Sequence, residues 1–291
     1  MIVRHTQQLL IMKKYIWVTS YPKSGNTMLR FFLSALFFTK NGTIDSLKAV
    51  KHITNFQNLI LNLPKVPSYD EFKKDISKVC PLWIAAQQYN SPQIKNALFV
   101  KTHSFMGNIN NYPLTSNKFT KGFIYIVRDP RSVVLSNMHH FKYTIQESVE
   151  KLLDNKRISL GQGAPVPEII TSWKNHYLSW KKFSKEVPSI IVKYEDILTN
   201  KENEFLKICD FLQKILPFNF NKAKFEKAIN SLDFNKLKKL EKKHGFEEKL
   251  YGRYFFRKGL IDEWKNILPD YLHEKIISNL KKEMSDLGYI K

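Results

Sequence analysis

The sequence predicts an α/β fold: a single domain in which helices flank a central, mostly parallel sheet. Three observations predict it. Several segments are short, unbroken apolar runs, helical stretches separate these runs, and a polar cluster follows each run directly. Unbroken apolar runs are typical of parallel strands covered on both faces. Strands that alternate with helices indicate a doubly wound sheet, whose ligands bind beyond the carboxyl ends of the strands.

The first predicted strand, residues 15–20 (YIWVTS), leads into a candidate anion-binding loop. The loop YPKSGNT (21–27) contains one glycine and turns at once into the apolar helix MLRFFLSALFF. Helix N-termini present free N–H groups and a positive dipole end, and the loop adds hydroxyls and a lysine. We therefore expect a P-loop-like phosphate site after the first strand. It is not a Walker A loop, because Lys23 precedes the only glycine and GK[ST] does not occur.

The remaining elements follow in order along the chain. Further strands are expected at 97–101, ending at Thr102-His103, at 122–127, ending at Arg128-Asp129-Pro130, and at 189–193, ending at Tyr194-Glu195-Asp196. Helices are expected at 69–79, 131–140, 145–155, 168–183 and 202–213, and the basic stretch 236–249 is predicted to be a solvated helix. With no internal repeat or linker, we expect one domain over 15–291 and a poorly ordered N-terminal extension over 1–14.

Three motifs resemble those of the PAPS-dependent sulfotransferase family of the cytosolic and bacterial type, where PAPS is 3′-phosphoadenosine 5′-phosphosulfate. YPKSGNT resembles the family's 5′-phosphosulfate loop. RDPRSVVLS, from Arg128 to Ser136, resembles its 3′-phosphate motif, and Arg257-Lys258-Gly259 within FFRKGLIDEWKN resembles its C-terminal RKGxxGDWKN signature. The three stand in family order and span residues 15–266.

The resemblance implies a PAPS site and the residues that form it. The loop residues Lys23, Ser24, Gly25, Asn26 and Thr27 are expected to hold the 5′-phosphate. Arg128, Ser136, Arg257, Lys258 and Gly259 are expected to hold the 3′-phosphate. Tyr194 is expected to contact the adenine and Phe234 to pack on it. As ordinary residues, Ser136 would be a helix-face hydroxyl and Tyr194 a core tyrosine; the order of the three motifs favours the functional interpretation.

The resemblance also implies three catalytic residues and no metal. His103, in Lys101-Thr102-His103, resembles the family's catalytic histidine, and a free imidazole pKa near 6.5 suits a neutral base. Lys23 is expected to donate to the bridging oxygen and Lys101 to stabilise the transferring sulfuryl oxygens. The expected reaction is in-line sulfuryl transfer to a hydroxyl or amine of a small molecule, with 3′-phosphoadenosine 5′-phosphate (PAP) as the product.

Two positions depart from the family pattern. Met28 stands where the family usually has a tryptophan near the adenine, which would weaken stacking on the base. Asp262-Glu263 replaces the usual Gly-Asp before Trp264, which changes the local turn. Neither departure removes an expected catalytic side chain.

Composition restricts the alternatives. The net charge of +21 comes mainly from lysine, with only seven arginines, so a nucleic-acid-binding protein is a remote alternative and no nucleic-acid partner is expected. A sulfotransferase acting on a glycan or lipid-linked sugar is the nearer alternative. Two cysteines outside any cluster and the lack of a long apolar stretch favour a cytoplasmic protein without a membrane span. It is expected to be a monomer or homodimer.

Overall fold

The computed structural model describes residues 14–161, 164–257 and 259–290. Nearly all of the predicted 1–14 extension and the expected phosphate ligand Lys258 lie outside these residues. The strands are β1 (Tyr15–Ser20), β2 (Thr54–Asn55), β3 (Leu98–Thr102), β4 (Asn108–Ile109), β5 (Tyr112–Pro113), β6 (Thr120–Val127), β7 (Ile158–Gly161), β8 (Ala164–Ile169) and β9 (Ser189–Lys193).

Helices connect and cover these strands. The α-helices are α1 (Asn26–Phe38), α2 (Phe56–Leu61), α3 (Tyr69–Lys74), α4 (Cys80–Asn90), α5 (Pro130–Phe141), α6 (Ile145–Leu153), α7 (Trp173–Phe183), α8 (Tyr194–Thr199), α9 (Lys201–Ile215), α10 (Lys222–Ser231), α11 (Phe234–His244) and α12 (Asp270–Asp286). Short 3₁₀ helices are η1 (Leu47–His52), η2 (Ile76–Val79), η3 (Ser91–Gln93) and η4 (Glu263–Asn266).

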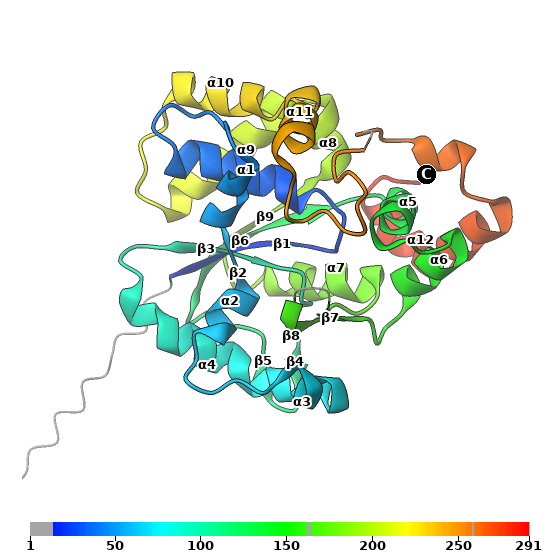
Figure 1. Cartoon of the computed structure of the whole chain (residues 1–291), viewed down its shortest axis with the longest axis horizontal. Helices are drawn as coiled ribbons and strands as arrows, with labels where there is room; N and C mark the ends of the chain where they lie inside the picture. Colours follow the sequence, from blue (N-terminus) through cyan, green and yellow to red (C-terminus); the bar gives the residue numbers. More distant parts are fainter. Residues whose placement is uncertain (1–13, 162–163, 258, 291) are drawn as a thin grey trace, which may run out of the picture.

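The central sheet has the order β2-β3-β1-β6-β9, and every neighbouring pair is parallel. The α/β fold class is therefore confirmed. In Figure 1 the sheet crosses the middle of the molecule, with α1, α9, α10 and α11 above it and α2, α4 and α7 below it. Small antiparallel pairs, β4-β5 and β7-β8, lie outside the sheet.

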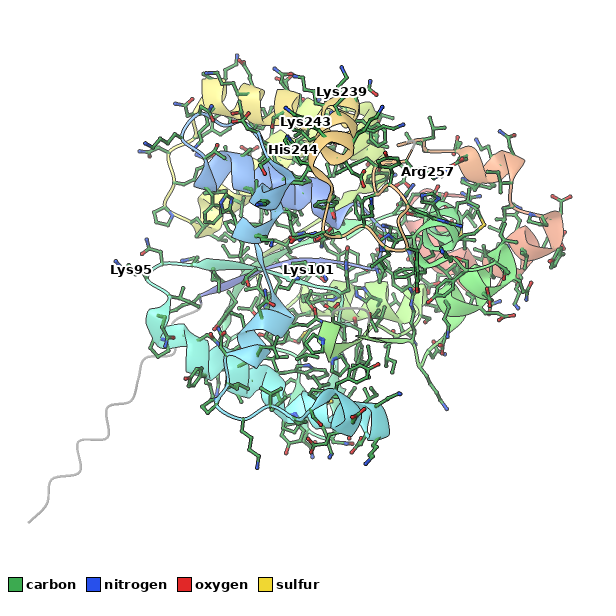
Figure 2. All side chains as sticks on the ribbon, viewed as in Figure 1. Lys95, Lys101, Lys239, Lys243, His244 and Arg257 are labelled. Atoms are coloured by element: carbon green, nitrogen blue, oxygen red, sulfur yellow. The ribbon has the colours of Figure 1, made fainter. Side chains whose placement is uncertain are left out.

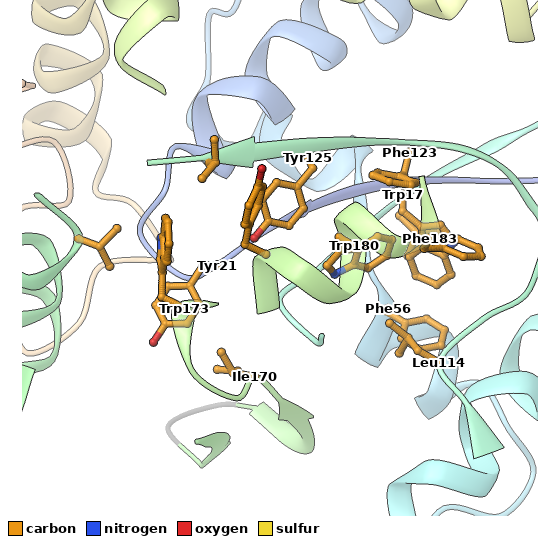
Figure 3. Close-up of a cluster of buried hydrophobic side chains, with 14 of the residues drawn as sticks. Trp17, Tyr21, Phe56, Leu114, Phe123, Tyr125, Ile170, Trp173, Trp180 and Phe183 are labelled. Carbon is orange, nitrogen blue, oxygen red and sulfur yellow. The ribbon is translucent and has the colours of Figure 1, made fainter. Parts of the chain in front are cut away.

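Side chains that alternate along β1 build two separate cores. Tyr15 and Trp17 point to one face and Ile16 and Val18 to the other, as the two-residue period of a strand requires. On the first face Trp17 packs with the aromatic residues of β6 and α7, including Phe123 (Figure 3). All four of these β1 side chains are fully buried, which explains the unbroken apolar run.

Three of the predicted helices differ from the structure, and one of them, 236–249, ends early, because α11 stops at His244 before Gly245. The predicted helix 168–183 is wrong at its start, because β8 continues to Ile169 and α7 begins only at Trp173. Pro165 and Pro167 disfavour a helix just before this point, and the Ser172 hydroxyl caps α7 by accepting the Asn175 N–H. The predicted helix 69–79 divides into α3 and η2, because Asp75 adopts an extended backbone.

Candidate active site

The topology brings the polar clusters of the sequence to one edge of the sheet. β1 is the central strand, with β3 on one side and β6 on the other. After β1 the chain forms β2 and β3 on one side of it, and then crosses to the other side to form β6 and β9. Ligands of open α/β sheets bind at such a switch point. A cavity of about 600 Å³ lies there. Its lining includes these expected site residues: Lys23, Gly25, Asn26, Thr27, Lys101, His103, Arg128, Ser136, Tyr194, Phe234, Arg257 and Gly259.

The loop after β1 adopts backbone angles that favour glycine at position 25. Gly25 precedes α1 with φ +103°, and a Cβ built there would lie 2.4 Å from Cδ2 of Tyr194. Lys23 also has a positive φ, +67°, which is costly for a residue with a side chain and clusters at functional sites. Gly25 therefore lets the Tyr194 ring pack directly against the start of α1, and Asn26 and Thr27 of its first turn line the cavity.

Three buried polar atoms around this loop have no hydrogen-bond partner among the described residues. They are Oγ of Ser24, Oδ1 of Asn26 and Nε of Arg128. Buried polar atoms are normally paired, so orphaned ones point to a missing ligand. The arginine and the serine are donors, as an anion requires. The residues therefore fit the phosphate end of a nucleotide, although Ser24 is buried beneath the cavity rather than lining it.

Arg128 connects the loop to the adenine side of the cavity. Its Nη1 donates to the Lys23 carbonyl oxygen at 3.0 Å, and its guanidinium carbon lies 4.5 Å from the centre of the Tyr194 ring. Ser136 lies on α5 and lines the same cavity. The Tyr194 ring and the hydrogen bond to the Lys23 carbonyl oxygen orient the guanidinium, but Nε has no partner among the described residues. Arg128 can therefore bind an additional anionic group.

The C-terminal signature closes the same cavity. Gly259 has φ +66°, and a Cβ at that position would come within 3.1 Å of the Phe234 ring. Arg257 Nη1 donates to Glu263 Oε1 at 2.8 Å. Glu263 is one of the two departures from the family pattern, so the acidic residue that replaces the expected one pairs with the arginine of the signature. Met28, the other departure, lines the cavity.

His103 is held in one tautomer by the end of β1. Its Nδ1 lies 2.7 Å from the carbonyl oxygen of Ser20. A carbonyl oxygen only accepts, so Nδ1 carries the proton and Nε2 is left as the basic nitrogen. Burial, and then the charge of Lys101, lower the pKa of His103 well below 6.5. The imidazole is therefore neutral at physiological pH.

Glu168, from β8, organises the strand end that carries His103. Its Oε1 accepts the His103 backbone N–H at 2.6 Å and the Thr102 hydroxyl at 3.2 Å, and its Oε2 lies 3.5 Å from Lys101 Nζ. The charge of Glu168 opposes the burial that lowers the pKa of Lys101. The sequence interpretation missed Glu168, because it placed this residue at the start of a helix.

Lys23 lines the cavity, next to Phe255. Its Nζ is 4.1 Å from the centre of the Phe255 ring. Burial, with a smaller contribution from Arg128, lowers the pKa of Lys23 to about 7. Lys23 therefore titrates near neutrality in this structure.

A carboxylate that no motif predicted also reaches the phosphate loop. Glu248 accepts the Thr27 hydroxyl at 2.9 Å and forms a buried ion pair with Arg30 of α1. Burial alone would raise the pKa of Glu248, but the charge and hydrogen bonds of Arg30 lower it to about 2. Thr27, an expected phosphate ligand, is thus bonded to a protein carboxylate.

The described residues contain no group of three or more histidine, cysteine, aspartate or glutamate side chains arranged to bind a metal ion. Within the same residues, none of the helices has the length and apolar character that crossing a membrane requires.

Comparisons with known proteins identify the family of this chain. The family model described as "Sulfotransferase domain" matches residues 13–288. Flavonol 3-sulfotransferase of Flaveria bidentis is 26% identical, with 94% of this chain and 83% of the relative covered. Sulfotransferase 1 family member D1 of Mus musculus is 25% identical, with 93% and 83% covered.

The fold is also found in solved structures. A mouse sulfotransferase, SULT7A1, complexed with PAP aligns with a TM-score of 0.62 at 20% identity, covering 96% of this chain and 87% of that one. Retinol dehydratase in complex with androsterone and PAP aligns with a TM-score of 0.62 at 18% identity, covering 94% and 81%. Because the family model spans nearly the whole chain, this protein belongs to the sulfotransferase domain family and is a sulfotransferase, and the resemblance noted in its motifs is confirmed.

Proposed function

We propose that this sulfotransferase transfers the sulfuryl group of PAPS to a hydroxyl or amine of a small-molecule acceptor, with His103 as the general base. The observation that carries the proposal is the hydrogen bond from His103 Nδ1 to the Ser20 carbonyl oxygen, 2.7 Å long. It commits one ring nitrogen and leaves Nε2 to accept a proton. The names of two relatives, flavonol 3-sulfotransferase of Flaveria bidentis and amine sulfotransferase of Oryctolagus cuniculus, support acceptors that carry a hydroxyl or an amine.

One part of the cavity, the nucleotide half, would hold PAPS through its 5′-phosphosulfate and its 3′-phosphate. The backbone of 23–27, together with Ser24 and Asn26, suits the 5′ side. Arg128, Ser136 and the 257–259 segment suit the 3′-phosphate. When bound, PAPS supplies the sulfuryl group and a phosphate leaving group. Tyr194, which packs beside Gly25, and Phe234, which packs beside Gly259, would take the adenine.

The other residues would move or stabilise charge around the acceptor. Nε2 of His103 takes the proton as the acceptor's oxygen or nitrogen attacks. Lys23, with a pKa near 7, can donate a hydrogen bond or a proton to the departing oxygen. Lys101, kept in place by Glu168, provides positive charge beside the transferring group.

Replacement of His103 by alanine separates catalysis from binding. We expect His103→Ala to lower the turnover of an aliphatic alcohol by about two to four orders of magnitude, the usual contribution of a general base. A nitrophenol, which ionises more easily, should lose less. The affinity for PAP, measured by calorimetry, should change little, because no nucleotide contact is assigned to His103.

His244→Ala is the matched control, since His244 is an exposed histidine at the end of α11 (Figure 2). It should behave as the wild type in both assays. Near-normal turnover of the alcohol by His103→Ala would rule out His103 as the base.

A further inference from the structure

Arg157 is a buried cation in the part of the cavity that the β7-β8 pair lines. It lies between α6 and β7, and its exposed fraction is 5%. The guanidinium carbon is 5.1 Å from the centre of the Tyr21 ring and 5.9 Å from that of Phe141. Its Nη1 donates to Tyr21 Oη at 2.6 Å. Aromatic faces and one hydroxyl hold the group in place without neutralising it.

No carboxylate of the described residues pairs with Arg157, and every aspartate and glutamate of the chain is among those residues. Asp154, which precedes it by three positions, instead pairs with Lys151 at 3.9 Å and accepts the Lys156 N–H. A buried charge without a counter-charge is costly, and proteins normally supply one. The natural interpretation is that the counter-charge arrives with a ligand.

The other well-buried arginines support this interpretation. Arg30 pairs with Glu248, and Arg131 pairs with Asp129 at 2.6 Å. Arg128 has no carboxylate partner among the described residues, and it is the residue expected to bind the 3′-phosphate of the nucleotide. Arg157 resembles Arg128 in this respect: it lies near an aromatic ring, it lines the cavity and it forms no ion pair with a carboxylate of the described residues.

Arg157 and the proposed base line the same cavity and bond to consecutive residues of the chain. His103 Nδ1 bonds to the carbonyl oxygen of Ser20, and Arg157 bonds to the hydroxyl of the next residue, Tyr21. The Tyr21 ring also packs edge-on against His176, whose Nε2 lies 3.1 Å from the His103 carbonyl oxygen. A small molecule with its nucleophile at His103 can therefore present a second group to Arg157.

We propose that the acceptor carries an oxyanion, such as a carboxylate or a phosphate or sulfate ester, which Arg157 binds while His103 receives the proton of the nucleophile. A guanidinium presents parallel N–H groups that match two oxygens of such a group. This inference rests on the proposed function, since it concerns the acceptor of the same reaction.

The test uses acceptors that differ only in charge. With PAPS, rates are measured for 3-(4-hydroxyphenyl)propanoate and its methyl ester. With PAP bound, affinities are measured for 3-phenylpropanoate and its methyl ester, which have no nucleophile. The wild type should prefer the acid by at least about tenfold in kcat/KM and in affinity, as expected for a charged hydrogen bond in a buried site.

Arg157→Gln should reduce that preference below about threefold, mainly through KM of the acid, and Arg157→Lys should recover part of it. The affinity for PAP should change less than about twofold. Lys156→Gln, which removes an exposed positive charge one residue away, is the control and should keep the wild-type preference.

Equal losses for acid and ester in Arg157→Gln would overturn the inference, because Arg157 would then act on the fold or on the donor. A wild type that sulfates both phenols without preferring the acid would also overturn it, while leaving the proposed function intact. Conversely, tighter binding of 3-phenylpropanoate than of its ester would support the anion site even if neither phenol is turned over.

Discussion

Lys23 affects both the backbone path of the loop and the positive charge in the cavity. Its left-handed backbone turns the chain toward α1, and Arg128 bonds to its carbonyl oxygen. Its ammonium is buried over Phe255, where it is poorly solvated, and its pKa falls to about 7. A nucleotide phosphate beside Nζ would favour the charged form and raise that pKa again.

Binding of PAP should therefore take up a proton at pH 8. In the nucleotide-free protein Lys23 is mostly neutral at that pH, because its pKa is about 7. The bound phosphates raise the pKa above 8, so up to about one proton enters and the affinity falls as the pH rises. Calorimetry in buffers of different ionisation enthalpy measures this uptake.

Lys23→Met should abolish most of the uptake, whereas Lys239→Met, at an exposed position on α11 (Figure 2), should not. Equal uptake by the wild type and Lys23→Met would mean that another group titrates.

At the scale of elements, the small β7-β8 pair positions the end of a strand in the main sheet. Glu168 projects from β8 to the His103 backbone N–H, the Thr102 hydroxyl and the Lys101 ammonium. Three groups at the end of β3 thus depend on an element that pairs only with its own neighbour. Arg157, immediately before β7, belongs to the same segment.

We expect Glu168→Gln to lower kcat by about ten- to a hundredfold while PAP affinity stays within about twofold, because Lys101 loses its counter-charge in a buried site. The pKa of Lys101 should fall further, so turnover should decline at a lower pH on the basic side than in the wild type. A pH profile of kcat distinguishes this positioning role from a loss of folded protein.

Glu186→Gln, at an exposed position after α7, is the control. A pH profile for Glu168→Gln that overlays the wild-type profile would contradict the assigned role.

The elements differ in how well the sequence predicts them. β1 and β9 have the predicted bounds, because each is a short apolar run that ends at a polar cluster. β2 was not predicted: its two residues become a strand only by pairing with β3, which lies far along the chain. The β7-β8 pair was also missed, because its apolar residues and prolines do not alternate clearly with polar residues.

At the scale of the whole molecule, the motifs predicted which residues meet, but not what surrounds them. Residues 23–27, 101–103 and 128 converge because the strands before them are parallel neighbours, which the order of elements implied. Glu248, Glu168 and Arg157 come from segments without a motif, and only the tertiary fold brings them to the cavity.

Transfer of label from PAPS tests the central claim most directly. The enzyme is incubated with sulfur-labelled PAPS and a panel of phenols, alcohols and amines, and products are identified by mass spectrometry. The account predicts label on an acceptor oxygen or nitrogen, one PAP formed for each product, and loss of about a hundredfold or more in His103→Ala. Label released only as inorganic sulfate, or equal product from wild type and His103→Ala, would contradict it.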